Sequence, residues 1–187
     1  MTRRVRLTYN PTPEIRQIQS EMDELQHKWS KGRKAAANRA ALEAAGFDLA
    51  SFDANTRVTN VKQPWAHALV TGVKDVENRS TEIPRLPEIM LIVASKAAPK
   101  EADLARYYSL GGPPADFEGQ AVIGAVEIVD NVRKSASPWF NPGGVGWVVG
   151  KYVQFPFPVE GVAGKQTPRL YLDRHDDRAR ILRELGF

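Results

Sequence analysis

Apolar residues recur at alternating intervals of three and four near the beginning of the chain. They are Ile15, Ile18, Met22, Leu25 and Trp29. This spacing places all five on one stripe of an α-helix. Thr12 suits the capping position before a helix and Pro13 suits its first residue, so we predict a helix from there to about Ser30. The stripe would pack against a second helix or the main domain, or it would bind a partner chain or a second copy.

A second helix is predicted directly after the first. Gly32 is expected to break the first helix, and the alanine-rich segment 33–45 favours a new one. Gly46 suits the left-handed residue that commonly follows a helix. Residues 1–55 are therefore predicted to form an N-terminal extension, a helical hairpin, and residues 47–60 are predicted to contain a linker into the next domain.

From Val61 the pattern changes to short apolar segments separated by turn residues, which favours strands. The strongest predicted strand is 121–129, and Gly124 within it indicates a bend or the close approach of another backbone. The other predicted strands are residues 73–80, 89–94, 146–153 and 169–172, and the other predicted helices are residues 63–71, 99–110 and 174–185. These elements predict an α+β domain at residues 56–173, with residues 174–187 as a C-terminal helix packed on it.

Composition narrows the class of protein. The 187 residues are 42% hydrophobic and 26% charged, as in an average globular protein, and no apolar run approaches the ~20 residues of a membrane span. The first residues show no secretory signal, so a cytoplasmic location is predicted. With no cysteine and with three histidines far apart in the chain, we expect no disulfide, no metal site and no cofactor.

The net charge of +4 is concentrated towards the N-terminus. One segment carries five basic residues and no acidic one: Lys28, Lys31, Arg33, Lys34 and Arg39. Such a patch suits contact with RNA phosphates. A solvated helical face is the alternative interpretation.

The densest group of charged residues follows the short helix predicted at residues 63–71. Gly72 is followed by Lys74, Glu77 and Arg79. Alternate residues of a strand face the same side, so Glu77 and Arg79 share one face. Arg79 offers forked donors, Glu77 offers acceptors and Lys74 adds a positive charge, a combination that suits a polar planar ligand. A ladder of ion pairs on an exposed edge strand is the alternative.

Three motifs in this order resemble the signature of the ASCH domain family, a part of the PUA-like superfamily. They are Gln63-Pro-Trp-Ala66, the Gly-x-Lys-x-x-Glu-x-Arg element from Gly72 to Arg79, and an apolar strand that ends in Ala94-Ser95. Segments 120–130, 146–149 and 155–159 continue the resemblance. It implies a PUA-like β-barrel with short flanking helices, a cleft beside the second motif, and binding of RNA or a nucleoside. Family members often carry a histidine near the end of the strand in which this chain has Val93.

The first functional hypothesis is a binding module that takes a base or modified nucleoside into this cleft. The residues expected to bind the ligand are Lys62, Gln63, Trp65, Gly72, Lys74, Glu77, Arg79, Ser95 and Trp147. An unstacked base would rest on the face of a tryptophan, for which Trp65, Trp139 and Trp147 are candidates. Trp65 and Trp147 equally suit a hydrophobic core, whereas Trp139 lies in a predicted loop.

The second hypothesis is a metal-independent hydrolase that uses the same cleft, with Lys74, Glu77 and Arg79 as its catalytic residues. Some small ASCH-like proteins resemble amidohydrolases that remove an acyl group from acylated cytidine, and Lys74 matches the lysine of those enzymes, although Glu77 stands where they carry a hydroxyl. Lys74 or Glu77 would act as general base and Arg79 would stabilise an oxyanion, on an acylated nucleoside or on RNA. The third hypothesis is an adaptor that binds a protein partner through its N-terminal helices.

Overall fold

The computed structural model describes residues 12–53, 56–117, 119–162 and 175–187. The described chain begins with α1 (Pro13–Ala44). The Thr12 side chain accepts a hydrogen bond from the Ile15 backbone N–H at 3.4 Å, as expected of a capping residue. The predicted start of the helix is confirmed.

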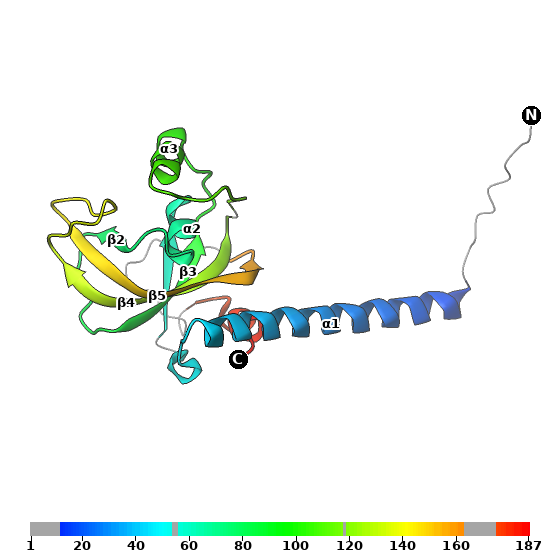
Figure 1. The fold of residues 1–187 in the computed structure, drawn as a ribbon. Coiled ribbons are helices and arrows are strands. Elements are labelled where there is room, and N and C mark those ends of the chain that lie inside the picture. The colour runs from blue at the N-terminus through cyan, green and yellow to red at the C-terminus, as the bar shows by residue number, and fades with distance from the viewer. Residues whose placement is uncertain (1–11, 54–55, 118, 163–174) are drawn as a thin grey trace, which may run out of the picture.

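The predicted helical hairpin is wrong, because α1 continues through Gly32 as one helix of 32 residues (Figure 1). A single glycine costs a helix only about 1 kcal/mol relative to alanine, and the residues on both sides of Gly32 favour the helix. The helix ends as predicted at Gly46, whose φ is 76°. Beyond it the Phe47 backbone N–H donates to the Leu42 carbonyl at 3.1 Å, which closes the last turn.

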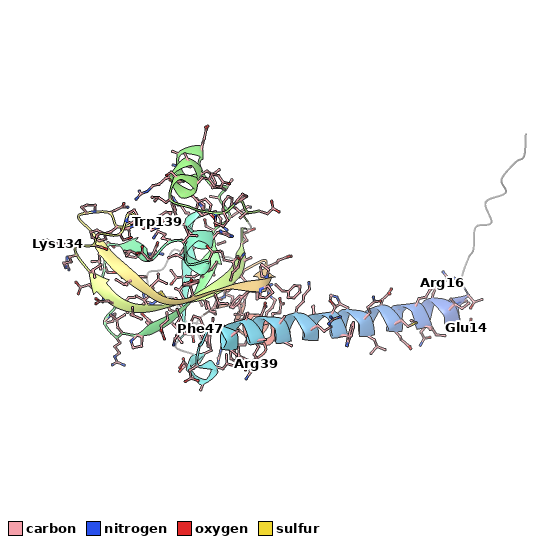
Figure 2. All side chains as sticks on the ribbon, viewed as in Figure 1. Glu14, Arg16, Arg39, Phe47, Lys134 and Trp139 are labelled. Atoms are coloured by element: carbon pink, nitrogen blue, oxygen red, sulfur yellow. The ribbon has the colours of Figure 1, made fainter. Side chains whose placement is uncertain are left out.

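The apolar stripe of α1 does not pack against the described body of the protein. Ile18, Met22, Leu25 and Trp29 are 56%, 64%, 67% and 65% exposed. The N-terminal half of the helix projects away from the sheet, with Glu14 and Arg16 at its far end (Figure 2). The expectation of packing is therefore wrong for these side chains, and pairing with another chain stays open.

The segment predicted as a linker is largely ordered structure. It contains a short 3₁₀ helix, η1 (Leu49–Ser51), and a strand, β1 (Arg57–Val61), and Phe47 and Phe52 are buried in the core. The sequence pattern did not predict β1 because the strand contains polar residues. Arg57 is nevertheless buried, because it forms an ion pair at 3.1 Å with Glu88 on the neighbouring strand.

Five strands form one mixed, curled sheet in the order β1-β3-β4-β5-β2 (Figure 1). The remaining strands are β2 (Val76–Arg79), β3 (Glu88–Ala94), β4 (Ala121–Val132) and β5 (Val145–Glu160). β1 runs parallel to β3, and the other neighbours are antiparallel. The predicted close approach at Gly124 is confirmed, since a Cβ there would lie 2.1 Å from the Val153 carbonyl oxygen.

β5 is longer than predicted, because it continues through Pro156 and Pro158 to Glu160. Residues 155–158 lie in a break of the register between β4 and β5, so Pro156 and Pro158 need not donate to that ladder. The strand predicted at residues 169–172 lies outside the described residues.

Helices cover both faces of the sheet (Figure 1). They are α2 (Trp65–Val70), α3 (Glu101–Ser109) and α4 (Arg178–Leu185). One core cluster joins the C-terminal part of α1, through Leu42, to Ile181 and Leu185 of α4 and to one face of the sheet. A second cluster joins α2 to the opposite face. The predicted α+β class and the closing C-terminal helix are confirmed.

Among the described residues no helix has the length and apolar character of a membrane span, and no cluster of three or more His, Asp or Glu side chains could hold a metal ion.

Candidate functional site

A tight turn between α2 and β2 positions the charged motif. Gly72 has a φ of 75° and lies beneath the ring of Tyr152, where a Cβ would come within 2.1 Å of the ring. The Lys74 backbone N–H then donates to the Ala68 carbonyl at 2.9 Å. Only glycine fits both the backbone conformation and this contact, so the turn delivers Lys74 to a fixed place at the end of α2.

Lys74, Glu77 and Arg79 converge in a linked group of charges. Lys74 is 4% exposed, and its ammonium donates to Glu77 Oε2 at 2.6 Å and to the Val76 carbonyl at 2.5 Å. The second Glu77 oxygen lies 3.0 Å from Arg79 Nε. Because Lys74 and Glu77 are largely withdrawn from water, the group is not a ladder of ion pairs on the surface. Burial lowers the pKa of the Lys74 ammonium, and the Glu77 carboxylate partly opposes that shift.

Trp147 lies behind this group and not in a ligand-accessible position. It is buried, and its indole N–H donates to the Thr81 carbonyl at 2.8 Å. The guanidinium of Arg79 lies 5.3 Å from the centre of its ring, and Arg57 approaches the same ring at 5.6 Å. Trp147 therefore supports Arg79 from the core, which fits the alternative reading of this tryptophan.

A cavity of about 300 Å³ opens in front of Lys74 and Glu77. Trp65 of α2 and Trp139 of the β4–β5 loop also line it, and their rings meet edge to face at 5.8 Å. Trp139 is labelled in Figure 2. The wall thus combines the predicted motif with an aromatic pair from two separate segments.

Hydrogen bonds hold the loop that carries Trp139 against the motif. The side chain of Asn78 donates to the Trp139 carbonyl at 2.7 Å and accepts from the Asn141 backbone N–H at 2.7 Å. Arg106 of α3 donates to the Pro138 carbonyl at 3.0 Å. Asn78, Arg106, Asn141 and Asp103 also line the cavity, and sequence reasoning missed all four. Asn78 lies within the motif, but nothing in the local sequence marks the other three.

Tyr107 fixes α3, and thereby Arg106, relative to α2. Its hydroxyl lies 2.8 Å from His67 Nδ1 and donates its proton to the Pro113 carbonyl at 2.9 Å. Since a hydroxyl has one proton, His67 Nδ1 must be the donor in the first contact. Burial lowers the pKa of His67, which favours the neutral ring, and raises the pKa of Tyr107 to about 12.

The other predicted ligand residues lie away from the cavity. Lys62 is exposed, and Gln63 is buried, with its side-chain Oε1 accepting a hydrogen bond from the His67 backbone N–H at 3.1 Å. Ser95 follows β3, and among the described residues its buried hydroxyl has no hydrogen-bond partner. Of the predicted set, the structure gathers Trp65, Lys74 and Glu77 around the cavity, with Gly72 and Arg79 as their supports.

The predicted phosphate-binding residues all lie on α1, on the opposite face of the sheet from α2 and the cavity (Figure 1). Arg33 stacks over Trp29 at 4.7 Å, and Lys34 lies 5.6 Å from the ring of Phe157. Arg39 donates to the Gly186 carbonyl at 2.8 Å, and Lys31 is exposed. Lys28 belongs to the same helix, but its side chain is outside the described set. The structure therefore does not bring this basic segment to the cavity.

Comparisons with known proteins found a sequence relative of this chain. The human protein Activating signal cointegrator 1 is 29% identical over an alignment of 126 residues, which covers 55% of this chain. The chain spans only 22% of the length of that relative. A crystal structure of a mutant ZmASCH protein from Zymomonas mobilis matches 70% of this chain and 95% of its own, with 16% identity and a TM-score of 0.42. No family model matches.

Proposed function

The ordered motifs of this sequence and its human relative support the ASCH domain family, and from that premise we propose that the cavity binds a base or modified nucleoside of single-stranded RNA. The observation that carries the proposal is the buried Lys74–Glu77 pair facing a pocket walled by two tryptophans. Charged hydrogen-bonding groups at the back and aromatic rings at the side are what recognition of an unstacked base requires.

The chemistry of the wall suits a planar ligand. The described contacts of Lys74 use two of the three ammonium donors, so a third can point to a carbonyl of the base. Glu77 can accept from an amino or imino group, and Trp65 offers an aromatic surface. A volume of about 300 Å³ lies at the lower end of ligand pockets, which favours one nucleoside over a longer segment.

The phosphates on either side of the bound base would meet the rim of the cavity. Arg106 is exposed there and lines the cavity from α3. The basic segment of α1 lies on the other face of the sheet, so one short RNA cannot contact both without passing around the domain. Arg106 therefore replaces that segment as the first candidate for a phosphate contact.

Binding should weaken about 10- to 100-fold when Lys74 is replaced by alanine, because a hydrogen bond to a charged group contributes roughly 1.5–3 kcal/mol. Calorimetric titration of the full chain with nucleosides and short single-stranded RNAs would measure this. Lys151→Ala is the matched control, since Lys151 also pairs with a glutamate, Glu127, at 3.2 Å but lies away from the cavity. Equal losses in both variants, or no binding by the unaltered chain even at low salt, would refute the proposal.

A second candidate function is hydrolysis of an acylated cytidine, favoured by the buried Lys74–Glu77 pair at the wall of the cavity. The Glu77 carboxylate, held by Lys74, would take a proton from water as the water oxygen attacks the acyl carbon. The C–N bond then breaks, and the proton passes to the departing amino group, giving a carboxylic acid and cytidine. Chromatography of acylated cytidine incubated with the protein and with Lys74→Ala would detect this. Product from the unaltered protein alone is expected, and product from neither protein, or the same amount from both, would reject this candidate.

A further inference from the structure

The projecting half of α1 presents an apolar seam that no described part of the chain covers. Its four exposed side chains lie between Ile18 and Trp29. The helix meets the body further on, where the Lys34 ammonium lies 5.6 Å from the centre of the Phe157 ring and the Asn38 side chain bonds to the backbone of β5. Large exposed apolar side chains in one continuous row are uncommon on the surface of a soluble monomer and mark interaction surfaces.

The seam has the spacing of a coiled coil. The alternating intervals of three and four correspond to heptad positions a and d, with Ile15, Met22 and Trp29 at a and Ile18 and Leu25 at d. Gly32 occupies the next d position, and a Cβ there would meet nothing within 4 Å. Gly32 has no side chain, so this end of the seam leaves space for a side chain of the facing helix.

Charge along the helix specifies which partner fits. Residues 14–24 contain Glu14, Glu21, Asp23 and Glu24 against the single basic Arg16, whereas residues 28–34 contain four basic residues and no acidic one. A second copy placed antiparallel brings each acidic half against a basic half. A parallel arrangement would place like charges together, which is unfavourable. We propose that this protein forms an antiparallel dimer through the projecting half of α1.

The length of the helix agrees with this arrangement. In one register, Ile18 faces the partner's Trp29 and Met22 faces the partner's Leu25, so large and smaller side chains alternate across the seam. Pro13 then lies opposite the partner's Lys34, close to the place where α1 reaches the body of the domain. This overlap is about 32 Å long at 1.5 Å per residue, and it places the two domains at opposite ends of the paired helices.

Sedimentation equilibrium of the full chain over a range of concentrations tests the dimer. We expect twice the monomer mass of 20.8 kDa, and at least tenfold weaker association for Leu25→Asp, which places a carboxylate in the seam. Ser20→Asp is the control, because it adds the same charge on the opposite face of the same helix. A chain that remains monomeric at every concentration overturns the proposal, as does a Ser20→Asp effect equal to that of Leu25→Asp. A monomer whose Trp29 fluorescence shows a covered ring would identify another part of the same chain as the occupant instead.

Disulfide trapping tests the orientation, because the chain contains no natural cysteine. In the proposed register Gln19 flanks the partner's Gln26, so Gln19→Cys combined with Gln26→Cys should form a covalent dimer under mild oxidation. Ile15→Cys should not, since its two copies lie about 25 Å apart along the axis. A dimer trapped by Ile15→Cys and not by the double variant would show a parallel pair and overturn the antiparallel one.

Discussion

Replacing Glu77 with glutamine is expected to lower the free energy of unfolding by about 3 kcal/mol, at the lower end of the range for breaking a buried ion pair. Glu77 is the shared counter-ion of Lys74 and Arg79, with separations of 2.6 and 3.0 Å. Glutamine preserves the shape but leaves the buried ammonium without its counter-charge. Lys74→Met should cost less, because Glu77 then keeps Arg79 as its partner. Urea unfolding of the three proteins gives the comparison.

The loss in Glu77→Gln should shrink as the pH rises. Burial already lowers the pKa of Lys74 below its ordinary value of 10.5, and the variant loses the carboxylate that opposes this shift. At pH values between the folded and the unfolded pKa of Lys74, the unfolded variant binds more protons than the folded variant. The free energy of unfolding of Glu77→Gln therefore increases with pH up to about 10.5. Glu127→Gln is the control, because its partner Lys151 is partly exposed, and it should lose less than about 1 kcal/mol at any pH. An equal loss in both variants would contradict a special role for the buried group.

Replacing Asn38 with alanine is expected to lower the free energy of unfolding by roughly 2–4 kcal/mol, because three hydrogen bonds to the backbone are lost together. Asn38 is 1% exposed. Its amide nitrogen donates to the Phe157 carbonyl at 2.7 Å and to the Glu184 carbonyl at 3.1 Å, and its oxygen accepts from the Phe157 N–H at 3.1 Å. One side chain therefore joins α1 to both β5 and α4.

Gln17→Ala is the matched control for Asn38→Ala, because it removes an amide from the exposed half of the same helix. Its hydrogen bond to Glu21 at 3.1 Å is open to solvent, so a change within about 0.5 kcal/mol is expected. Hydrogen exchange should also show faster exchange at the C-terminal end of α1 in Asn38→Ala only. Unchanged exchange there, with stability equal to that of the control, would show that the docking does not depend on Asn38.

Local sequence patterns were enough to predict an element where interactions between nearby residues decide its conformation. Thr12 and Gly46 mark the ends of α1 because their effects act within one helical turn. The strand at 121–129 was recognisable because a continuous apolar run needs only burial on both faces. Gly32 misled the prediction because one glycine has too small an effect to interrupt a helix with strong neighbours.

Long-range partners account for the elements that patterns missed. β1 contains Arg57, Thr59 and Asn60, and its first residue can be buried because Glu88 on another strand neutralises its charge. Pro156 fits in a strand because the pairing of β5 with β4 is interrupted at that point. Neither condition can be read from the residues nearby.

For the candidate site, the sequence by itself determined that Glu77 and Arg79 share one face and that Lys74 follows a glycine turn, because strand alternation and glycine geometry are local. The tertiary structure alone decided that these charges are buried and open into a cavity. It also brought Trp139 and Arg106 to that cavity from two distant segments, and it left the stripe of α1 exposed. The reason is physical: burial and pocket shape depend on which surfaces meet, and those surfaces come from parts of the chain that only folding brings together.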